Sequence, residues 1–420
     1  MLQEIRFHHL SNWHPASVGL QITSQDELSP NNIALVEKAG FSDAIPLEAW
    51  SALGTNQQQA YSTHGLFRYF GKFPPSIATY LISTYTQPGQ LIFDPMCGSG
   101  STALECLLLN RDCVANDINP LSAGITKVKT TPIPLEKLNA SLLEIEKNYR
   151  PMTWEEYSFE PHDLKNYHHW FLDETCDSLR GLKYQIESIC DPDIKDFFTI
   201  IFASVIRRAS KATTQQGRLF LDVETALPDA FSLFYSKAKK EIQNVSLLPL
   251  RDCALDIYNG DMRDQKFHCY QDAASLVILH PPYFNSYKYS SINSLESGWL
   301  GIDRSSFRSG EIKEFFKVGK PEKYADYVED MATALSYGLS FLKPDGVLAL
   351  MIGDSIIKGN YLPVTNTLIQ KIDHSKYKID KIAIRVPRYT EASWVASQRR
   401  SANNIGITLN DFIVLFRRSH

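Results

Sequence analysis

The sequence predicts an α/β fold in which a mostly parallel sheet carries helices on both faces. Two observations favour it: short apolar runs of strand length recur from residue 90 to the C-terminus, and segments of helical character lie between several of them. A third observation is that residues 131–249 separate two consecutive strands. Because a crossover between parallel strands needs only about a dozen residues beyond the strands, we expect an inserted helical lobe there.

The seven predicted strands are runs of mostly apolar residues, the pattern of strands that are buried on both faces. They cover residues 90–96, 113–118, 254–258, 274–280, 346–353, 380–386 and 411–417. The last two follow each other without a clear long helix, which predicts a hairpin at an edge of the sheet. Helices are predicted over residues 101–110 and 325–342 in the core, and over residues 135–149, 177–189 and 193–212 in the insertion.

The first 60 residues are polar and irregular, and we expect them to form an arm that packs on the core through Trp13 and Trp50. The predicted organisation therefore has three parts. They are an N-terminal arm (1–60), a core domain (61–130 and 250–420) and the helical insertion (131–249).

The composition limits the class of protein. Hydrophobic residues make up 44% of the chain and charged residues 21%, which excludes wholesale disorder. The net charge of -4 at pH 7 means that any contact with a polyanion has to be local. No apolar run approaches the roughly 20 residues of a membrane helix, and the N-terminus lacks a signal-peptide pattern. The seven cysteines include no CxxC pair, as in proteins with reduced thiols. We therefore expect a soluble cytoplasmic protein with no membrane partner.

A glycine-rich turn, FDPMCGSGST at residues 93–102, stands where a strand is predicted to give way to a helix. Gly98 and Gly100 have no side chain to clash, so the backbone can turn tightly against a ligand, to which the following helix presents free N–H groups. Asp117 ends the next predicted strand, where its carboxylate can accept hydrogen bonds from both hydroxyls of a ribose. These residues predict a nucleoside cofactor, while the dinucleotide pattern GxGxxG is absent.

Three motifs in a consistent order resemble those of the S-adenosylmethionine-dependent amino-methyltransferases of DNA, which methylate N4 of cytosine or N6 of adenine. Residues 93–102 are similar to the cofactor motif DPxxGSGT. Residues 64–82 contain KFPP and resemble the segment, with the core KFxP, that caps the methionine end of the cofactor. Residues 280–290 begin with HPPY and resemble the catalytic motif (S/N/D)PP(Y/F). The resemblance covers most of residues 60–420 except the insertion, and it implies a Rossmann-like, seven-stranded methyltransferase sheet.

The resemblance implies S-adenosyl-L-methionine as the cofactor and a set of positions that bind it. These positions are Lys72, Phe73, Pro74, Asp94, Pro95, Gly98, Ser99, Gly100, Ser101, Thr102, Asp117, Ile118 and Asp261. Asp261 follows the strand predicted over residues 254–258, where members of the family contact the adenine ring. No metal site is predicted, because the pair His168–His169 has no partner at the spacing of a zinc site.

The catalytic residues that the resemblance implies are His280, Pro281, Pro282 and Tyr283. The exocyclic amine of a base is a poor nucleophile, so a site must offer acceptors to its N–H groups. The two prolines lack an N–H and can hold a backbone carbonyl towards the amine, while Tyr283 can stack on a flipped-out base.

His280 departs from the Ser, Asn or Asp of the family. A neutral imidazole can accept a hydrogen bond from the amine or take up the proton that it loses. Alternatively His280 only packs at the strand end, or the site is impaired. The residues around His280 look more like those of family members with the motif SPPY. This similarity favours cytosine as the target base.

Basic residues without acidic neighbours predict the contact with DNA. Arg207, Arg208, Lys211 and Arg218 fall within the insertion, which makes it the expected target-recognition region. A second cluster is interleaved with Tyr389 and Trp394 and contains Arg385, Arg388, Arg399 and Arg400.

The leading prediction is a site-specific methyltransferase that modifies double-stranded DNA, and N4 of cytosine is the favoured target. Its expected setting is restriction–modification, where a cognate restriction endonuclease would be its partner. The sequence leaves open N6 of adenine as the target, methylation of an RNA base amine, and a DNA-binding subunit without activity. A C5-cytosine enzyme is disfavoured, because that reaction needs a cysteine nucleophile, usually in a Pro-Cys doublet, which this chain lacks.

Overall fold

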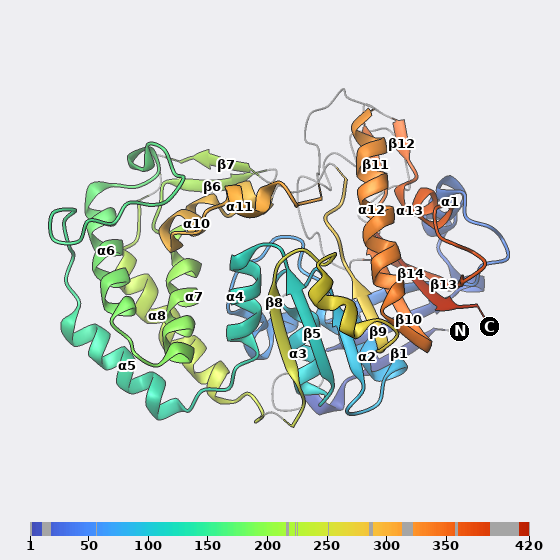
Figure 1. Cartoon of the computed structure of the whole chain (residues 1–420), viewed down its shortest axis with the longest axis horizontal. Helices are drawn as coiled ribbons and strands as arrows, with labels where there is room; N and C mark the ends of the chain where they lie inside the picture. Colours follow the sequence, from blue (N-terminus) through green and yellow to red (C-terminus); the bar gives the residue numbers. More distant parts are fainter. Residues whose placement is uncertain are drawn as a thin grey trace.

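The computed structural model describes residues 2–10, 18–55, 57–215, 218–222, 224, 226–250, 252–284, 289–312, 322–357, 360–386 and 411–419. These residues form a ten-stranded sheet with a helical lobe at one end (Figure 1). The strands, in their spatial order, are β1 (Gln3–Arg6), β2 (Gly19–Ser24), β3 (Leu47–Leu53), β13 (Tyr377–Arg385), β14 (Asp411–Arg418), β10 (Leu342–Ile352), β9 (Ala274–Leu279), β4 (Leu91–Asp94), β5 (Asp112–Asp117) and β8 (Leu255–Asn259).

All seven predicted strands are present, and the predicted α/β fold class is confirmed. The five strands from β10 to β8 are parallel to one another. The predicted hairpin also exists, because β13 and β14 pair in antiparallel fashion.

Two details of the prediction are wrong: the sheet has ten strands, not seven, and the hairpin does not lie at its edge. β3 pairs in parallel with β13, and β2 and β1 continue the sheet beyond it. The first 60 residues therefore extend the sheet and are not an irregular arm. Their strands were missed because β1 is largely exposed and β3 is only half-buried, so neither forms a continuous apolar run.

Alternate residues of the central strands enter two different cores, as the two-residue period of a strand requires. In β10, Leu348 and Leu350 pack with α1 (Pro30–Ala39), α12 (Glu322–Ser340) and α13 (Val364–Ile369). Ala349 and Met351 pack on the opposite face with α2 (Pro75–Tyr85) and α3 (Ser101–Leu108). Helices therefore cover both faces of the sheet, as expected.

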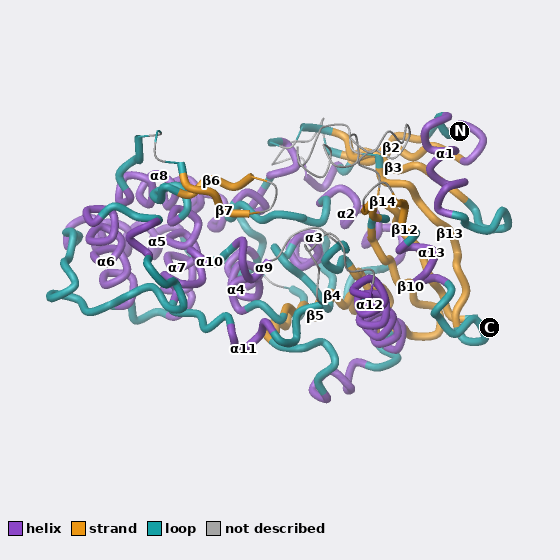
Figure 2. Tube along the Cα trace, turned by 90° about the horizontal axis from the view of Figure 1, so that it is seen from above, coloured by secondary structure: helices purple, strands orange, loops and turns teal. Residues whose placement is uncertain are grey.

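The helical lobe lies beside α4 (Pro120–Lys129), and its apolar core is continuous with side chains of α3 and α4 (Figures 1 and 2). Its helices are α5 (Leu135–Asn148), α6 (Asp173–Glu187), α7 (Pro192–Ile206) and α8 (Ala230–Ser246), with a hairpin of β6 (Ala212–Gln215) and β7 (Arg218–Leu221). The three predicted helices correspond to α5, α6 and α7. The last ends at Ile206 and not at residue 212, where β6 already begins.

Three short helices follow the strand β9 and lead the chain from the core sheet to the lobe, where the second of them packs. They are α9 (Tyr289–Ile292), α10 (Ser294–Leu300) and α11 (Ser305–Arg308). A small hairpin of β11 (Ser355–Ile357) and β12 (Asn360–Leu362) follows β10. Within the described part of the chain, no helix is long and apolar enough to cross a membrane.

Candidate cofactor and base-binding site

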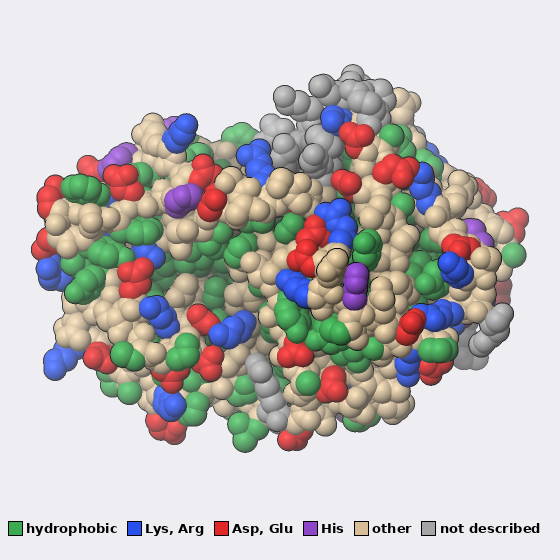
Figure 3. All heavy atoms as spheres, viewed as in Figure 1, with side chains coloured by type: hydrophobic (Ala, Val, Ile, Leu, Met, Phe, Trp, Pro, Cys, Tyr) green, Lys and Arg blue, Asp and Glu red, His purple; other side chains and the backbone are tan. Residues whose placement is uncertain are grey.

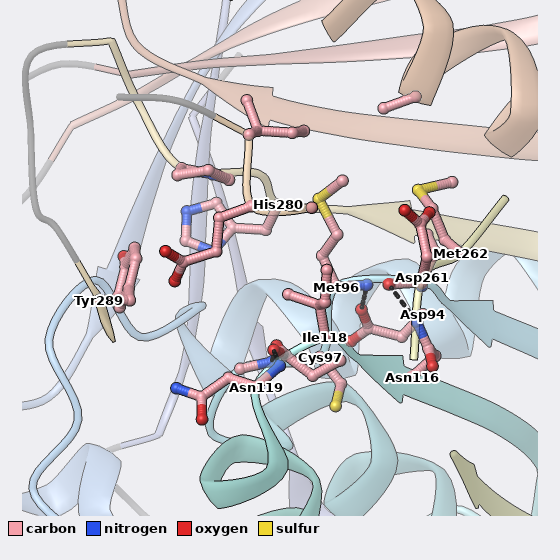
Figure 4. Close-up of a pocket in the computed structure, with 18 of the residues that line it drawn as sticks. Asp94, Met96, Cys97, Asn116, Ile118, Asn119, Asp261, Met262, His280 and Tyr289 are labelled. Carbon is pink, nitrogen blue, oxygen red and sulfur yellow. Dashed lines mark hydrogen bonds between the residues drawn. The ribbon is translucent and has the colours of Figure 1, made fainter. Parts of the chain in front are cut away.

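The carboxyl ends of four parallel strands meet at one edge of the sheet and line an open pocket, the usual position for a ligand in such a sheet. Asp94 ends β4, Asp117 ends β5, Asp261 follows β8 and His280 follows β9. The pocket encloses about 1050 Å³, including the space open to solvent at its mouth. In Figure 4, His280 and Tyr289 lie at one end of this pocket, and Asp94 and Asp261 lie at the other. The pocket is large enough for a nucleoside-sized ligand.

The glycine-rich turn needs its two glycines. Gly98 and Gly100 have φ angles of +51° and +70°, a region that other residues rarely adopt. A Cβ atom on Gly100 would stand 2.6 Å from Oγ1 of Thr126, and one on Gly98 would stand 3.2 Å from Cε1 of Tyr69. The turn is therefore pressed against α4 on one side and against Tyr69 on the other.

Asp117 holds the turn from the neighbouring strand. Its Oδ2 atom accepts a hydrogen bond from the Gly98 N–H at 2.8 Å, and its Oδ1 atom accepts one from the Asn119 N–H at 2.8 Å. Burial raises the pKa of Asp117 to about 6, although these two hydrogen bonds favour the ionised form. Each carboxylate oxygen keeps a second lone pair, so Asp117 can still accept hydrogen bonds from a ligand.

Asp94 is buried at the pocket wall with little to balance a negative charge. Its Oδ1 atom accepts a hydrogen bond from the Met96 N–H at 3.3 Å. Burial, and to a smaller extent the neighbouring Asp117, raise the pKa of Asp94 to about 7. A cationic group bound in the pocket would therefore gain a buried carboxylate as its partner.

Two neighbouring amides add polar atoms to the same wall. Among the described residues, buried side-chain atoms without a hydrogen-bond partner include Oδ1 of Asn116 and Nδ2 of Asn119. Both asparagines line the pocket (Figure 4). Buried polar atoms are normally paired, so these two atoms are suited to bind a polar ligand.

A buried polar cluster lies behind the glycine-rich turn and ties it to the segment of residues 64–82. Oε1 of Glu105, on α3, accepts hydrogen bonds from the Tyr61 hydroxyl at 2.6 Å and from Nε2 of His64 at 2.7 Å. The Thr79 hydroxyl donates to Oε2 at 2.6 Å. Burial raises the pKa of Glu105 to about 7 and lowers that of His64, so the imidazole is neutral. Sequence reasoning missed this cluster because its members lie on separate elements.

Two lysines complete the cluster, and neither lines the pocket. Lys72 donates from Nζ to the His64 carbonyl at 3.0 Å, and burial lowers its pKa to about 8. Lys129, at the end of α4, donates to the Ser99 carbonyl at 2.6 Å. Lys72 therefore supports the segment from within, and Lys129 anchors the glycine-rich turn.

His280 stands at the end of β9 with its ring beside two aromatic rings. The ring of Phe73 meets it edge-on at 5.4 Å between centroids, and Nε2 lies 3.3 Å from the Tyr283 hydroxyl. Burial lowers the pKa of His280 to about 4, so the imidazole is neutral at pH 7. The Pro282 carbonyl accepts a hydrogen bond from the Tyr327 hydroxyl at 2.8 Å.

Ten of the residues predicted for the cofactor and catalytic sites line the pocket: Phe73, Asp94, Pro95, Gly98, Ser99, Asp117, Ile118, Asp261, His280 and Pro282. The pocket lining does not include Lys72, Pro74, Gly100, Ser101, Thr102, Pro281 or Tyr283. Burial alone would raise the pKa of Asp261, but its hydrogen bonds from Arg263 outweigh burial and lower it. The sequence analysis missed Tyr69, Asn116, Asn119, Tyr289 and Glu311. Of these only Glu311 stands apart from the segments that the resemblance covers, since Tyr69 lies within residues 64–82, the two asparagines flank Asp117 and Ile118, and Tyr289 lies within residues 280–290.

The basic residues predicted to bind DNA have different surroundings. Arg207 is largely buried and pairs with Glu296 at 2.8 Å. Lys211 donates to the His168 carbonyl at 3.1 Å, whereas Arg208 is exposed. Only the backbone of Arg218, in β7, is described.

The second basic cluster falls almost wholly outside the described residues. Arg388 is one of those positions, and the described Arg385 pairs with Asp411 at 2.8 Å in a buried site. On the face seen in Figure 3, basic and acidic side chains are interspersed.

Asp354, which follows β10, caps the helix α13. Its Oδ1 atom accepts hydrogen bonds from the Thr365 N–H at 2.7 Å and from the Thr365 hydroxyl at 2.8 Å, at the start of α13.

Comparison with known proteins finds similarity to methyltransferases. Residues 24–127 match the DNA methylase family, a range that includes the glycine-rich turn and Asp117 and ends before His280. The type II methyltransferase M.MvaI of Kocuria varians is 30% identical over 279 residues, which cover 60% of each chain. The type II methyltransferase M.BsoBI of Geobacillus stearothermophilus is 22% identical over 290 residues, 59% of this chain and 54% of that one.

The chain thus spans little more than half the length of these relatives. A solved structure, the rRNA methyltransferase AviRa of Streptomyces viridochromogenes, covers 87% of this chain and 93% of its own at 12% identity, with a TM-score of 0.33. By sequence, the chain is therefore similar to DNA methylases over residues 24–127 and to a type II methyltransferase over 60% of its length.

Proposed function

We propose that this protein transfers a methyl group from S-adenosylmethionine to the exocyclic amine of a base in double-stranded DNA. The observation that carries the proposal is that polar groups suited to a nucleoside line the same pocket as His280 and Pro282 of the HPPY motif. The relatives named above are type II methyltransferases, which supports DNA as the substrate.

The residues of the pocket fit S-adenosylmethionine. Asp94 would pair with the ammonium of its methionine part, because this carboxylate is buried without a cation. Asp117 would accept hydrogen bonds from the ribose, and the Asn119 amide offers a buried donor nearby. The bound cofactor supplies a methyl group on a positively charged sulfur, so the protein has only to position the amine and accept its proton.

The acceptors for the amine would come from the HPPY motif. The Pro282 carbonyl keeps a second lone pair beside its hydrogen bond from Tyr327. Because Pro282 and His280 both line the pocket, we assign the contact with the amine to the Pro282 carbonyl and to the His280 ring. A neutral imidazole can accept a hydrogen bond, and its low pKa makes it a weak base. Positioning the amine in line with the methyl group would then provide most of the catalysis.

We further propose N4 of cytosine as the target, because residues 280–290 look more like the SPPY group than like the adenine enzymes. The exposed Arg208 is our choice for a phosphate contact in the lobe, while Arg207 is not, since its partners lie inside the protein. We also predict a cognate restriction endonuclease as the partner of this protein.

The experiment that tests the proposal is long-read, modification-sensitive sequencing of DNA from methylation-deficient cells that express the protein. An Asp94→Asn variant is the control. A modified motif that appears only with the intact protein is the expected result, and the modified base distinguishes cytosine from adenine. If the purified protein binds S-adenosylmethionine but the cells show no modified DNA, the proposed substrate is wrong.

A further inference from the structure

Two tyrosines form an aromatic wall at the end of the pocket where His280 lies. The rings of Tyr69 and Tyr289 stack with centroids 5.7 Å apart and planes at 18°, and both line the pocket. Figure 4 shows Tyr289 on the same side of the cavity as His280, away from Asp94 and Asp261. No motif in the sequence assigns a role to either ring.

Neighbouring elements hold both rings in place. The Tyr69 hydroxyl shares a hydrogen bond with Ser122 at 2.9 Å, and its ring lies against Gly98 of the glycine-rich turn. Tyr289 begins the helix α9, whose backbone is tied from outside: Arg304 donates to the Ser290 carbonyl at 3.1 Å, and Ser290 also bonds to Glu311. A fixed ring loses little conformational entropy when a ligand stacks on it.

The tyrosine of the HPPY motif is less suited to this role. Tyr283 packs against the core formed by α12 and its neighbours, and it is not among the residues that line the pocket. Its hydroxyl faces Nε2 of His280 at 3.3 Å, so its contact is with the catalytic ring. The position opposite His280 is left to Tyr289.

We propose that Tyr289, backed by Tyr69, is the face on which the flipped-out target base stacks while its amine meets His280. This inference rests on the proposed function, since it assigns a contact with the base of the DNA substrate. Base–aromatic stacking contributes about 1–3 kcal/mol per base, which corresponds to roughly a 5- to 150-fold change in the rate of transfer.

The test compares Tyr289→Leu, which removes the ring, with Tyr289→Phe, which keeps it. Single-turnover methyl transfer is measured from radiolabelled S-adenosylmethionine to unmethylated bacteriophage DNA, and cofactor binding is measured by calorimetry. Tyr184→Leu, on the outer surface of α6 where the side chain is 45% exposed, is the matched control. We expect Tyr289→Leu to transfer about 5- to 150-fold more slowly with unchanged cofactor affinity, and the other two variants to remain near the wild-type rate.

Three results would overturn the inference. Wild-type transfer by Tyr289→Leu would remove any role of the ring, and an equal loss in Tyr289→Phe would show that the hydroxyl, not the ring face, matters. A parallel loss of cofactor affinity would assign Tyr289 to the cofactor instead. A wild-type protein that binds the cofactor but methylates no DNA would overturn the proposed function as well, so the two failures can be told apart.

Discussion

Arg207 and Arg208 are adjacent in sequence, but their substitution is expected to have opposite consequences. Arg207 is 14% exposed and pairs at 2.8 Å with Glu296, which is 4% exposed. Its Nη2 atom also donates to the Ile292 carbonyl at 2.6 Å, and its guanidinium lies over the ring of Phe70. Arg208 is exposed to solvent.

The size of the effect follows from these contacts. Removing one partner of a buried ion pair costs about 3–5 kcal/mol, because the other charge stays buried without compensation. We therefore expect Arg207→Ala to lower the free energy of unfolding by about 4 kcal/mol. Arg208→Ala removes an exposed side chain, which typically changes stability by less than about 0.5 kcal/mol.

Urea unfolding measures the stability of each variant, and DNA binding at several salt concentrations measures the phosphate contact. Each neutralised phosphate contributes about 0.9 to the slope of log K against log salt. We expect Arg208→Ala to lower that slope by about one and Arg207→Ala to leave it unchanged.

A double-mutant cycle with Glu296→Gln makes the test sharper. In Arg207→Ala/Glu296→Gln no buried charge is left unpaired, so the double variant should lose less stability than the sum of the two single losses. A stable Arg207→Ala variant with a reduced salt slope would refute the reasoning, because it would mean that Arg207 binds phosphate and not Glu296.

Three further predictions concern the pocket. Asp94, whose pKa is about 7, must be ionised to pair with an ammonium, so calorimetry should show that affinity for S-adenosylmethionine falls about tenfold per pH unit below pH 7. Asp94→Asn should bind weakly at every pH, and a pH-independent wild-type affinity would contradict the assignment. His280, with a pKa of about 4, stays neutral from pH 6 to 9. The pH–rate profiles of the wild type and of His280→Ser should therefore have the same shape near pH 6.5, and a limb there that His280→Ser lacks would contradict this pKa. Lys129→Met removes the donor to the Ser99 carbonyl, a hydrogen bond of about 1.5–3 kcal/mol, and should weaken cofactor binding at least about tenfold in a calorimetric titration. The control is Lys137→Met, on an exposed face, which should bind the cofactor normally.

The sequence predicts the centre of the fold better than its borders. β9 and residues 346–352 of β10 are buried on both faces and therefore appear as mostly apolar runs. β1 and β3 are exposed along part of their length, so their sequences contain charged residues and do not differ from a loop. The helix α8 is different, because its buried residues Phe234, Ala238, Ile242 and Val245 follow the helical period and could have been predicted.

The candidate site, like the fold, could be predicted only in part. Residues that end parallel strands, such as Asp94, Asp117 and His280, can be predicted to meet, because strand ends share one edge of the sheet. Tyr289 lies within residues 280–290, but the letters of the catalytic motif assign it no role. Glu311 comes from a connecting segment after α11, and no period or motif fixes where such a segment folds. The partner of Arg207 was unpredictable for the same reason, because Glu296 lies on α10, far along the chain.

Arg207 also shows that the lobe is not built from one continuous stretch of sequence. Leu295 and Trp299 of α10 belong to the same apolar core as α7 and α8. Because Arg207 ends α7 and bonds to the Ile292 carbonyl at the end of α9, the lobe is fixed to the helix that presents Tyr289. A movement of the lobe on binding a ligand would then be transmitted to the wall of the pocket beside His280. This link gives the lobe a route to influence the site through α9, beside the contact that its apolar core already makes with Tyr69 of the pocket wall.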